Sequence, residues 1–295
     1  MKKSFLRLHA AIFLAGFTGI LGRLITLNEG LLVWYRMLFS AVALWLIALF
    51  YKKLQTISHA DKLRIAGIGF IAALHWLTFY ASIKYSNVSV ALVCFSAVGF
   101  FTAVIEPLIF RKKFVIAELG LGLLVIAGIF IIFQFDTRYK TGIVIGVVSA
   151  MLAALFPILN RPILQRVTAE TLTTWEITGG FLCLTLIMPF YLYLFPVATI
   201  LPTQSDFFWL LFLALFCTVL AFQLSALALQ KLSAFTVNLS YNLEPVYGIL
   251  LAFVIYAENR ELGISFYAGI TLIVLAVVLQ TLRFAHQRKT GVGKI

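Results

Sequence analysis

Long apolar runs dominate this chain, and they favour helices that cross a membrane. Such a helix needs about 20 mostly apolar residues to span a hydrocarbon core of roughly 30 Å. Only 12% of the 295 residues are charged, whereas 62% are hydrophobic, and the mean hydropathy is +1.04. Soluble domains carry about 25% charged residues, which they need to cover their outside. The apolar surplus of this chain must therefore face lipid.

Ten segments are long and apolar enough to span a membrane: 6–25, 30–51, 63–83, 88–110, 115–135, 141–159, 172–195, 207–229, 234–256 and 262–282. Their connections are short except for 196–206, so we expect no inserted soluble domain. Basic residues at 2–7 precede the first run, as in a signal peptide. Because nine further spans follow and no clear small-residue cleavage site is present, we interpret this run as the first span.

The net charge of +12 is distributed in short basic runs between the apolar segments. Nucleic-acid-binding proteins instead gather basic residues on one solvated face, so we expect no nucleic-acid partner. Cytoplasmic loops of membrane proteins carry an excess of Lys and Arg. With both termini cytoplasmic, 17 Lys and Arg residues lie inside and 5 outside. We therefore predict a multi-pass protein of a bacterial-type cytoplasmic (inner) membrane with both termini cytoplasmic.

The two halves of the chain show a weak internal similarity. A shift of 147 residues aligns 84–86 with 231–233, and a shift of 138 aligns 14–25 with 152–163. The matches keep their order along the chain, and the longer connection after the seventh span absorbs the change of offset. This order indicates an internal repeat of five spans.

Five spans is an odd number, so the second half must start on the opposite side of the membrane from the first. We therefore predict an all-α membrane protein with ten transmembrane helices in two inverted five-helix repeats. The first repeat covers 1–137, the second 138–284, and 285–295 form a cytoplasmic tail. Inverted repeats are typical of secondary transporters, whose site lies near the middle of the membrane. A receptor or a scaffold does not need that symmetry.

Two short segments carry a resemblance to a known family. Residues 242–247 read NLEPVY and residues 257–262 read AENREL. They are similar to the EP segment of span nine and the GER segment before span ten in the EamA-type, ten-span branch of the drug/metabolite transporter superfamily. Arg36 in the second span resembles an arginine common there. The chain departs from the family where Val98 replaces the usual proline and where 110–113 replace the first GER segment.

The resemblance covers almost the whole chain. It implies a ten-helix bundle with a central cavity that exports or exchanges small metabolites across the membrane. It does not name the substrate, because the family spans amino acids, other metabolites and drug-like compounds.

Few ionisable residues lie inside the predicted spans: Arg36, His75, Glu106, Glu176 and Glu244. A charge at membrane depth costs at least about 2.5 to 3.5 kcal/mol, so such residues usually face an aqueous cavity or a partner. Glu106 and Glu176 are expected near the cytoplasmic interface, and we predict a structural pairing for both.

Span nine has the densest polar character of the chain, with Asn238, Tyr241, Asn242 and Glu244. Pro245 removes a backbone hydrogen bond and frees a carbonyl in the preceding turn. We predict that these four residues line a substrate cavity and that Glu244 is a proton or amine site. The alternative is that Glu244 only caps or pairs at a kink.

Span three carries an aromatic stripe of His75, Trp76, Phe79 and Tyr80. The repeat offset places Phe222 and Gln223 opposite the first two, so we predict that His75, Trp76, Phe79, Tyr80 and Gln223 contact the substrate. Aromatic faces hold apolar or cationic solutes, although a histidine among aromatic rings also fits plain packing.

Arg36 lies roughly 9 Å into span two at 1.5 Å per residue. It either attracts a substrate carboxylate or pairs with an acid on a neighbouring helix, with snorkelling to the interface as the alternative.

No motif of an ATPase, zinc protease or serine hydrolase occurs in the sequence, and Cys94, Cys183 and Cys217 have no metal-ligand spacing. We therefore predict no catalytic residues, no metal and no cofactor. The sequence favours an efflux permease, a secondary transporter that exports or exchanges small metabolites such as amino acids by alternating access. Proton coupling would run through Glu244 or His75, and the protein would act as a monomer or homodimer.

Two alternatives remain open. A carrier of lipid-linked or nucleotide sugars would need more cationic residues in the cavity than Arg36. An intramembrane enzyme would need converging catalytic groups, for which the sequence offers only His75 and Glu106.

Overall fold

The structure is a computed structural model that describes residues 2–51, 54–232, 234–241 and 243–290. Every regular element in these ranges is a helix. In chain order they are α1 (Lys2–Leu24), α2 (Glu29–Tyr51), α3 (His59–Tyr85), α4 (Val88–Phe95), α5 (Val98–Phe110), α6 (Ile116–Phe135), η1 (Thr137–Tyr139), α7 (Lys140–Ile163), α8 (Ala169–Leu194), α9 (Gln204–Ala214), η2 (Leu215–Leu220), α10 (Ala221–Leu229), α11 (Ala234–Tyr241), α12 (Leu243–Tyr256), η3 (Glu258–Arg260) and α13 (Ile264–Thr290).

The helices confirm the predicted fold class of a ten-span membrane protein. Eight helical segments of the described residues are long and apolar enough to cross a membrane, and α4 with α5, and α9 with η2 and α10, each form one of them. The ninth and tenth spans contain shorter apolar helices, Leu243–Tyr256 and Ile264–Leu279. Together these elements occupy the ten predicted segments.

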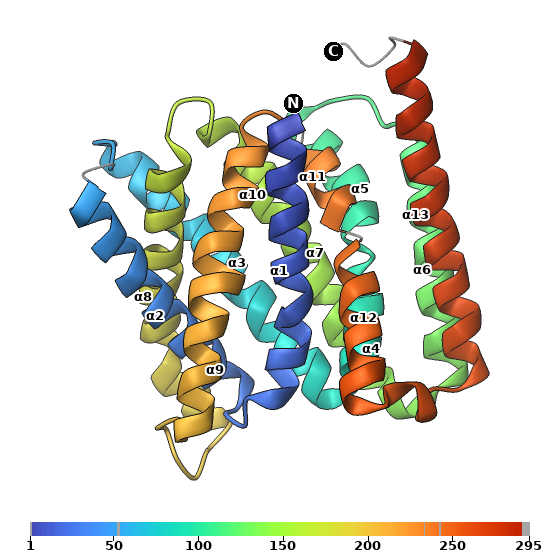
Figure 1. The fold of residues 1–295 in the computed structure, drawn as a ribbon, viewed down its shortest axis with the longest axis horizontal. Helices are drawn as coiled ribbons and strands as arrows, with labels where there is room; N and C mark the ends of the chain where they lie inside the picture. The colour runs from blue at the N-terminus through green and yellow to red at the C-terminus, as the bar shows by residue number, and fades with distance from the viewer. Residues whose placement is uncertain (1, 52–53, 233, 242, 291–295) are drawn as a thin grey trace.

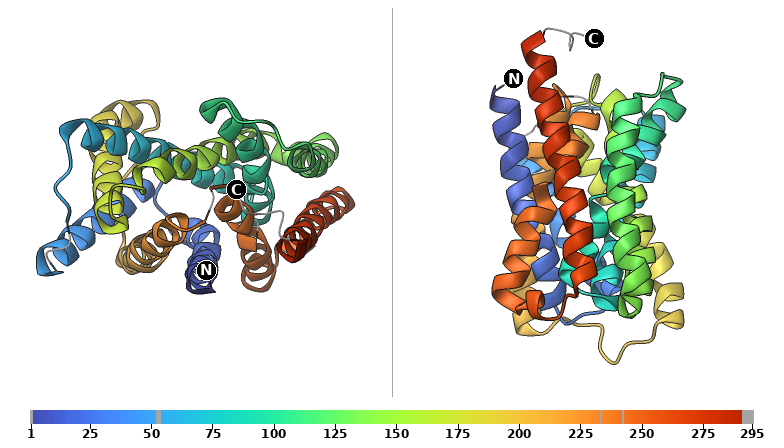
Figure 2. Two further views of the ribbon diagram at one scale, coloured as in Figure 1. Left: turned by 90° about the horizontal axis from the view of Figure 1, so that it is seen from above. Right: turned by 90° about the vertical axis from the view of Figure 1, so that its right-hand side faces the viewer.

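The long helices run side by side as one bundle (Figure 1). Helix α1 begins and helix α13 ends at the same end of the bundle, and α7 runs in the direction opposite to α1. Helices α6 and α13 pack against each other at one side, while α2 and α8 pack at the other (Figures 1 and 2). The opposite directions of α1 and α7 agree with two repeats of inverted topology.

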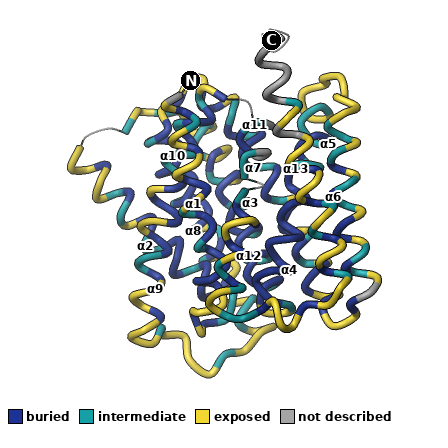
Figure 3. Tube along the Cα trace, turned by 45° about the vertical axis from the view of Figure 1, so that its right-hand side comes forward, coloured by how far each residue is buried: buried dark blue, intermediate teal, exposed yellow. Residues whose placement is uncertain are grey.

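The outer surface of the bundle is apolar, as a lipid-facing surface must be. Large side chains such as Leu186, Val254 and Ile264 are exposed, and exposed residues follow the outward faces of the helices (Figure 3). The buried core is rich in alanine, leucine and isoleucine. Apolar residues therefore occupy both the inside and the outside of the bundle.

Glycine permits a very close contact between α3 and α8. A β-carbon at Gly69 would overlap the carbonyl oxygen of Glu176, and one at Gly180 would overlap the carbonyl oxygen of Gly69. Small residues let membrane helices approach in this way. The contact fixes the position of α8, and with it the Glu176 side chain, beside the centre of the bundle.

Candidate functional site

Two of the spans that surround the centre of the bundle are irregular. The fourth span is interrupted at Ser96 and Ala97 between α4 and α5, although Val98 stands where the resemblance led us to expect proline. The eighth span contains η2, a π-helix, in which the Thr218 hydroxyl donates a hydrogen bond to the Leu213 carbonyl at 2.9 Å. π-Helical turns are frequent at functional sites.

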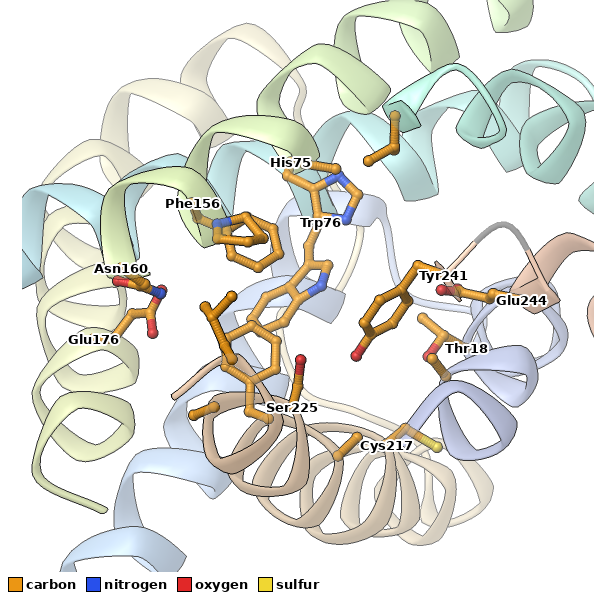
Figure 4. Close-up of a pocket in the computed structure, with 18 of the residues that line it drawn as sticks. Thr18, His75, Trp76, Phe156, Asn160, Glu176, Cys217, Ser225, Tyr241 and Glu244 are labelled. Carbon is orange, nitrogen blue, oxygen red and sulfur yellow. The ribbon is translucent and has the colours of Figure 1, made fainter. Parts of the chain in front are cut away.

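A cavity lies between the helices, and residues of both irregular spans line it (Figure 4). About 870 Å³ of its space, including its open part, is not filled by protein atoms. Its wall combines aromatic rings with a few polar groups: Thr18, Arg36, His75, Trp76, Phe79, Phe95, Phe156, Asn160, Glu176, Cys217, Phe222, Ser225, Tyr241 and Glu244.

Arg36 reaches the cavity from α2 and is only 2% exposed. Its Nε donates to the Thr218 hydroxyl at 2.7 Å, and its Nη1 donates to the Tyr80 hydroxyl at 2.8 Å. The guanidinium carbon lies 3.8 Å from the centre of the Trp76 ring. Among the described residues no carboxylate lies within 4.0 Å of this guanidinium, so the charge is held by neutral groups and an aromatic face.

His75 lines the cavity but is also firmly bonded within the protein. Its Nδ1 lies 2.9 Å from the Ser149 hydroxyl and 3.1 Å from the Ser149 carbonyl, and the ring contacts Phe79, Phe95 and Phe156. The carbonyl contact favours the tautomer with a proton on Nδ1. His75 is thus an oriented part of the aromatic wall.

The ninth span contributes Tyr241 and Glu244 to the cavity. The Tyr241 hydroxyl points toward Ser225, with which it is hydrogen-bonded (Figure 4). Glu244 is buried and interacts electrostatically with Arg36 at more than contact distance. The predicted partners in this span, the Asn238 side chain and residue Asn242, lie outside the described part of the chain.

Two of the predicted contact residues do not line the cavity. Tyr80 lies behind Arg36, to which its hydroxyl is bonded, and is fully buried. Gln223 lies on another face of α10, whose lining residues include Ala221, Phe222 and Ser225. Since adjacent helical residues are about 100° apart, Gln223 turns away from the wall. The structure therefore places Phe222 in the cavity wall, beside Trp76, and Gln223 away from the wall.

The two remaining intramembrane acids differ from each other. Glu106 accepts a hydrogen bond from Lys112 at 3.1 Å, as expected for a structural pair, and lies outside the cavity wall. Glu176 was expected to pair similarly near an interface. Instead it is 1% exposed, lines the cavity, and accepts one hydrogen bond from the Asn160 amide at 2.8 Å.

Several residues of the cavity wall were not predicted from the sequence. Thr18, Phe156, Asn160 and Ser225 are short polar or aromatic residues of apolar helices, and none is charged. Asn160 did carry a local signal, because it lies between Pro157 and Pro162 in α7. Prolines free backbone groups of a membrane helix for polar partners.

A buried carboxylate fastens the end of the bundle opposite the start of α1. Glu258 accepts hydrogen bonds from the backbone N–H groups of Val88 and Ser89, at 3.1 and 2.8 Å, and from the Ser89 hydroxyl at 2.6 Å. Arg23 donates to the same carboxylate at 2.6 Å. Glu258 thereby caps α4, where an anion is favourable at a helix N-terminus, and joins α1, α4 and the loop before α13.

His75 and Glu106, the two groups that an intramembrane enzyme would need close together, have separate partners. His75 is bonded to Ser149, and Glu106 is bonded to Lys112 away from the cavity wall. In the described part of the chain, no cluster of three His, Cys, Asp or Glu residues could hold a metal ion. The arrangement is that of a helix bundle with a cavity between its helices.

Comparison with known proteins places this architecture in a family. The model of the EamA-like transporter family matches the chain twice, over residues 3–134 and 140–282. The chain therefore belongs to the EamA-like transporter family, within the drug/metabolite transporter superfamily. This is a transporter family and not an enzyme family, and the two matches are the two repeats.

Solved structures share the fold. One, described only as "Crystal structure of protein", superposes with a TM-score of 0.68 at 16% sequence identity, over 96% of this chain and 97% of that chain. At this identity the likeness concerns the fold alone. A search of curated proteins found no match.

Proposed function

We propose that this protein is a secondary transporter that exports or exchanges small metabolites, such as amino acids, across the cytoplasmic membrane by alternating access. The observation that carries the proposal is the cavity, whose wall comes from both family repeats and combines Arg36 and Glu244 with aromatic rings. Opposite charges beside aromatic faces suit a small molecule with both polar and apolar parts.

The position of the cavity suits loading from the cytoplasm. The wall runs along α7 from Ala153 to Leu164, the residue after the helix, includes Leu172 and Glu176 of α8, and reaches Leu229 on α10. These positions extend from the middle of the bundle to the end where α1 begins, which the Lys and Arg distribution assigns to the cytoplasm. The opposite end is fastened by Glu258, so the arrangement suits a transporter that faces inward and loads from the cytoplasm.

The charge of the wall favours a small metabolite over the alternative of a sugar carrier. A nucleotide or lipid diphosphate carries at least two negative charges, which cationic side chains must match. Arg36 is the only Lys or Arg in the described cavity wall, which also contains the carboxyl groups of Glu176 and Glu244. The cavity therefore suits a substrate that is not strongly anionic.

Counterflow into proteoliposomes tests transport. Vesicles preloaded with each member of a metabolite panel should accumulate the labelled form of the substrate, and Trp76→Ala should lower the rate at least about tenfold by removing the ring that supports Arg36. The control is Trp209→Ala, which removes a partly exposed tryptophan of α9 outside the cavity wall. No counterflow for any panel member with folded protein would contradict transport.

A further inference from the structure

Glu176 is a buried acid that has no cationic partner in the part of the chain that the structure describes. Among the described residues no Lys, Arg or His nitrogen lies within 4.0 Å of its carboxylate, and its hydrogen-bond partner is the uncharged Asn160 amide. A carboxylate at membrane depth without a cation is costly, so such residues mark ion or substrate sites. Its place in the cavity wall makes this carboxylate available to a ligand.

The side-chain oxygen of Asn160 is an acceptor without a hydrogen-bond donor in the described structure. The Asn160 Nδ2 donates to Glu176, but the buried Oδ1 has no hydrogen-bond partner there. Buried polar atoms are nearly always bonded, and one left without a partner costs about 1–3 kcal/mol. Glu176 and Asn160 therefore form a pair that lacks donors. A protonated amine supplies three donors and a positive charge.

A different polar group lies on the other side of the cavity. Figure 4 shows Glu176 and Asn160 on one side of Trp76, and Tyr241 and Glu244 on the other. Arg36, stacked on Trp76, can pair with a substrate carboxylate, and the carboxyl oxygens of Glu244 can accept hydrogen bonds from an adjacent ammonium group.

Aromatic rings separate these two polar groups. Trp76 and Phe222 have ring centres 5.2 Å apart, and Phe222 stacks on Phe156 at 5.8 Å. Such a surface suits a short aliphatic chain and also stabilises cations. A substrate that fits the whole cavity is polar at both ends and apolar in the middle.

We propose that the substrates are diamino acids of the lysine and ornithine type, with the distal ammonium group bound by Glu176 and Asn160 and the amino-acid head bound by Arg36 and Glu244. The proposal rests on the transport function proposed above. Charge supports it, because Arg36, Glu176 and Glu244 sum to one negative charge when ionised, and a diamino acid carries one positive charge. Binding neutralises the cavity, as a low-dielectric environment favours.

The test compares lysine with norleucine, which has the same carbon chain without the distal amine. In counterflow with reconstituted full-length protein, the wild type should move lysine at least about tenfold better than norleucine. Glu176→Gln keeps the shape of the side chain and removes its charge. It should lower the preference for lysine roughly 10- to 100-fold, since a hydrogen bond to a charged group contributes about 1.5–3 kcal/mol.

Glu170→Gln is the matched control, because it removes a carboxylate from the first turn of the same helix, outside the cavity wall, and should keep the lysine preference. If Glu176→Gln does not fold, the wild type still decides the matter. Lysine should raise its melting temperature in detergent and norleucine should not, since a ligand that binds the folded state stabilises it.

The outcomes separate the two proposals. If the wild type transports and binds norleucine as well as lysine, or if Glu176→Gln keeps the wild-type preference, the diamino acid proposal is overturned and transport stands. If folded protein moves neither amino acid nor any other panel metabolite, the transport function itself is overturned.

Discussion

Single buried side chains bond elements that are far apart in the sequence. Arg36 connects α2 with α3 and with the π-helix η2, through Tyr80, Thr218 and the Cys217 carbonyl. Glu258 connects the loop before α13 with α1 and α4. Because water is scarce at these positions, each lost partner leaves a group that nothing else satisfies.

Replacement of Glu258 should show how much this carboxylate stabilises the fold. Glu258→Ala leaves two backbone N–H groups of α4 and the Arg23 guanidinium without their acceptor, so we expect a loss of at least about 1–3 kcal/mol in unfolding free energy. Glu258→Gln keeps one acceptor oxygen, so its stability should lie between that of the wild type and that of Glu258→Ala. The measurement is the melting temperature in detergent. Glu261→Ala, an exposed neighbour, is the control, and an equal loss in that variant would contradict the capping role.

Asp136 provides a pH-dependent contribution at the connection between the two repeats. Hydrogen bonds from the Arg138 side chain, at 3.0 and 2.9 Å, hold the pKa of the Asp136 carboxyl below its ordinary value. A lowered folded-state pKa stabilises the protein above the unfolded pKa of about 3.9, and this stabilisation is lost as pH falls through the folded-state pKa.

Asp136→Asn should therefore lose about 0.2–1 kcal/mol at pH 7, a small amount because Arg138 is exposed, and should lose less further stability than the wild type below about pH 4. Melting temperatures across a pH series measure this. Arg138→Ala should have a similar effect, and the double variant should add little to either change. Strictly additive losses would show that the pair does not act as a unit.

At the scale of helices, packing depends on small residues at specific contacts. In the pair α6 and α13, a β-carbon at Gly128 would lie 2.6 Å from the Gly269 carbonyl oxygen, and one at Gly269 would lie 2.5 Å from the Gly128 carbonyl oxygen. Two backbones thus touch where the end of the first repeat meets the end of the second. The pairing of α6 and α13 therefore needs glycine at both positions, and an apolar residue of another kind would not fit.

Gly128→Leu should separate these helices and destabilise the protein by about 1–3 kcal/mol, as overpacking usually does. Gly120→Leu is a matched control on the same helix, because nothing lies within 4 Å of a β-carbon there. Melting temperatures in detergent compare the two. Equal stability of both variants would mean that α6 and α13 can move apart without cost.

At the scale of the whole molecule, the orientation in the membrane decides which end of the bundle faces the cytoplasm. An impermeant thiol reagent tests it in a background with Cys183→Ser and Cys217→Ser, since Cys94 is buried whereas Cys217 lines the cavity. In intact cells Thr199→Cys, in the long connection between α8 and α9, should react at once. His59→Cys, at the start of α3, should react only after the membrane is opened. The reverse pattern would overturn the proposed orientation.

Much of the site could be predicted from the sequence, because polar residues inside an apolar span are costly and therefore stand out. Arg36, His75, Trp76, Phe79, Tyr241 and Glu244 all line the cavity. The prediction of where a side chain points was less successful. Tyr80 lies behind Arg36, and Gln223 turns away from the cavity. Glu176 lines the cavity, whereas the sequence led us to expect a structural pairing near the interface.

The sequence by itself determined that the chain spans a membrane, roughly where its ten spans lie, and that it consists of two similar halves. Each span can be recognised from its own length and apolar composition, because the bilayer has a fixed thickness, and no knowledge of its neighbours is needed. Only the tertiary structure decided that Asn160 meets Glu176, that Glu258 caps α4, and that Arg36 lies on Trp76. Those contacts depend on helix rotation and close approach, which apolar composition alone leaves open.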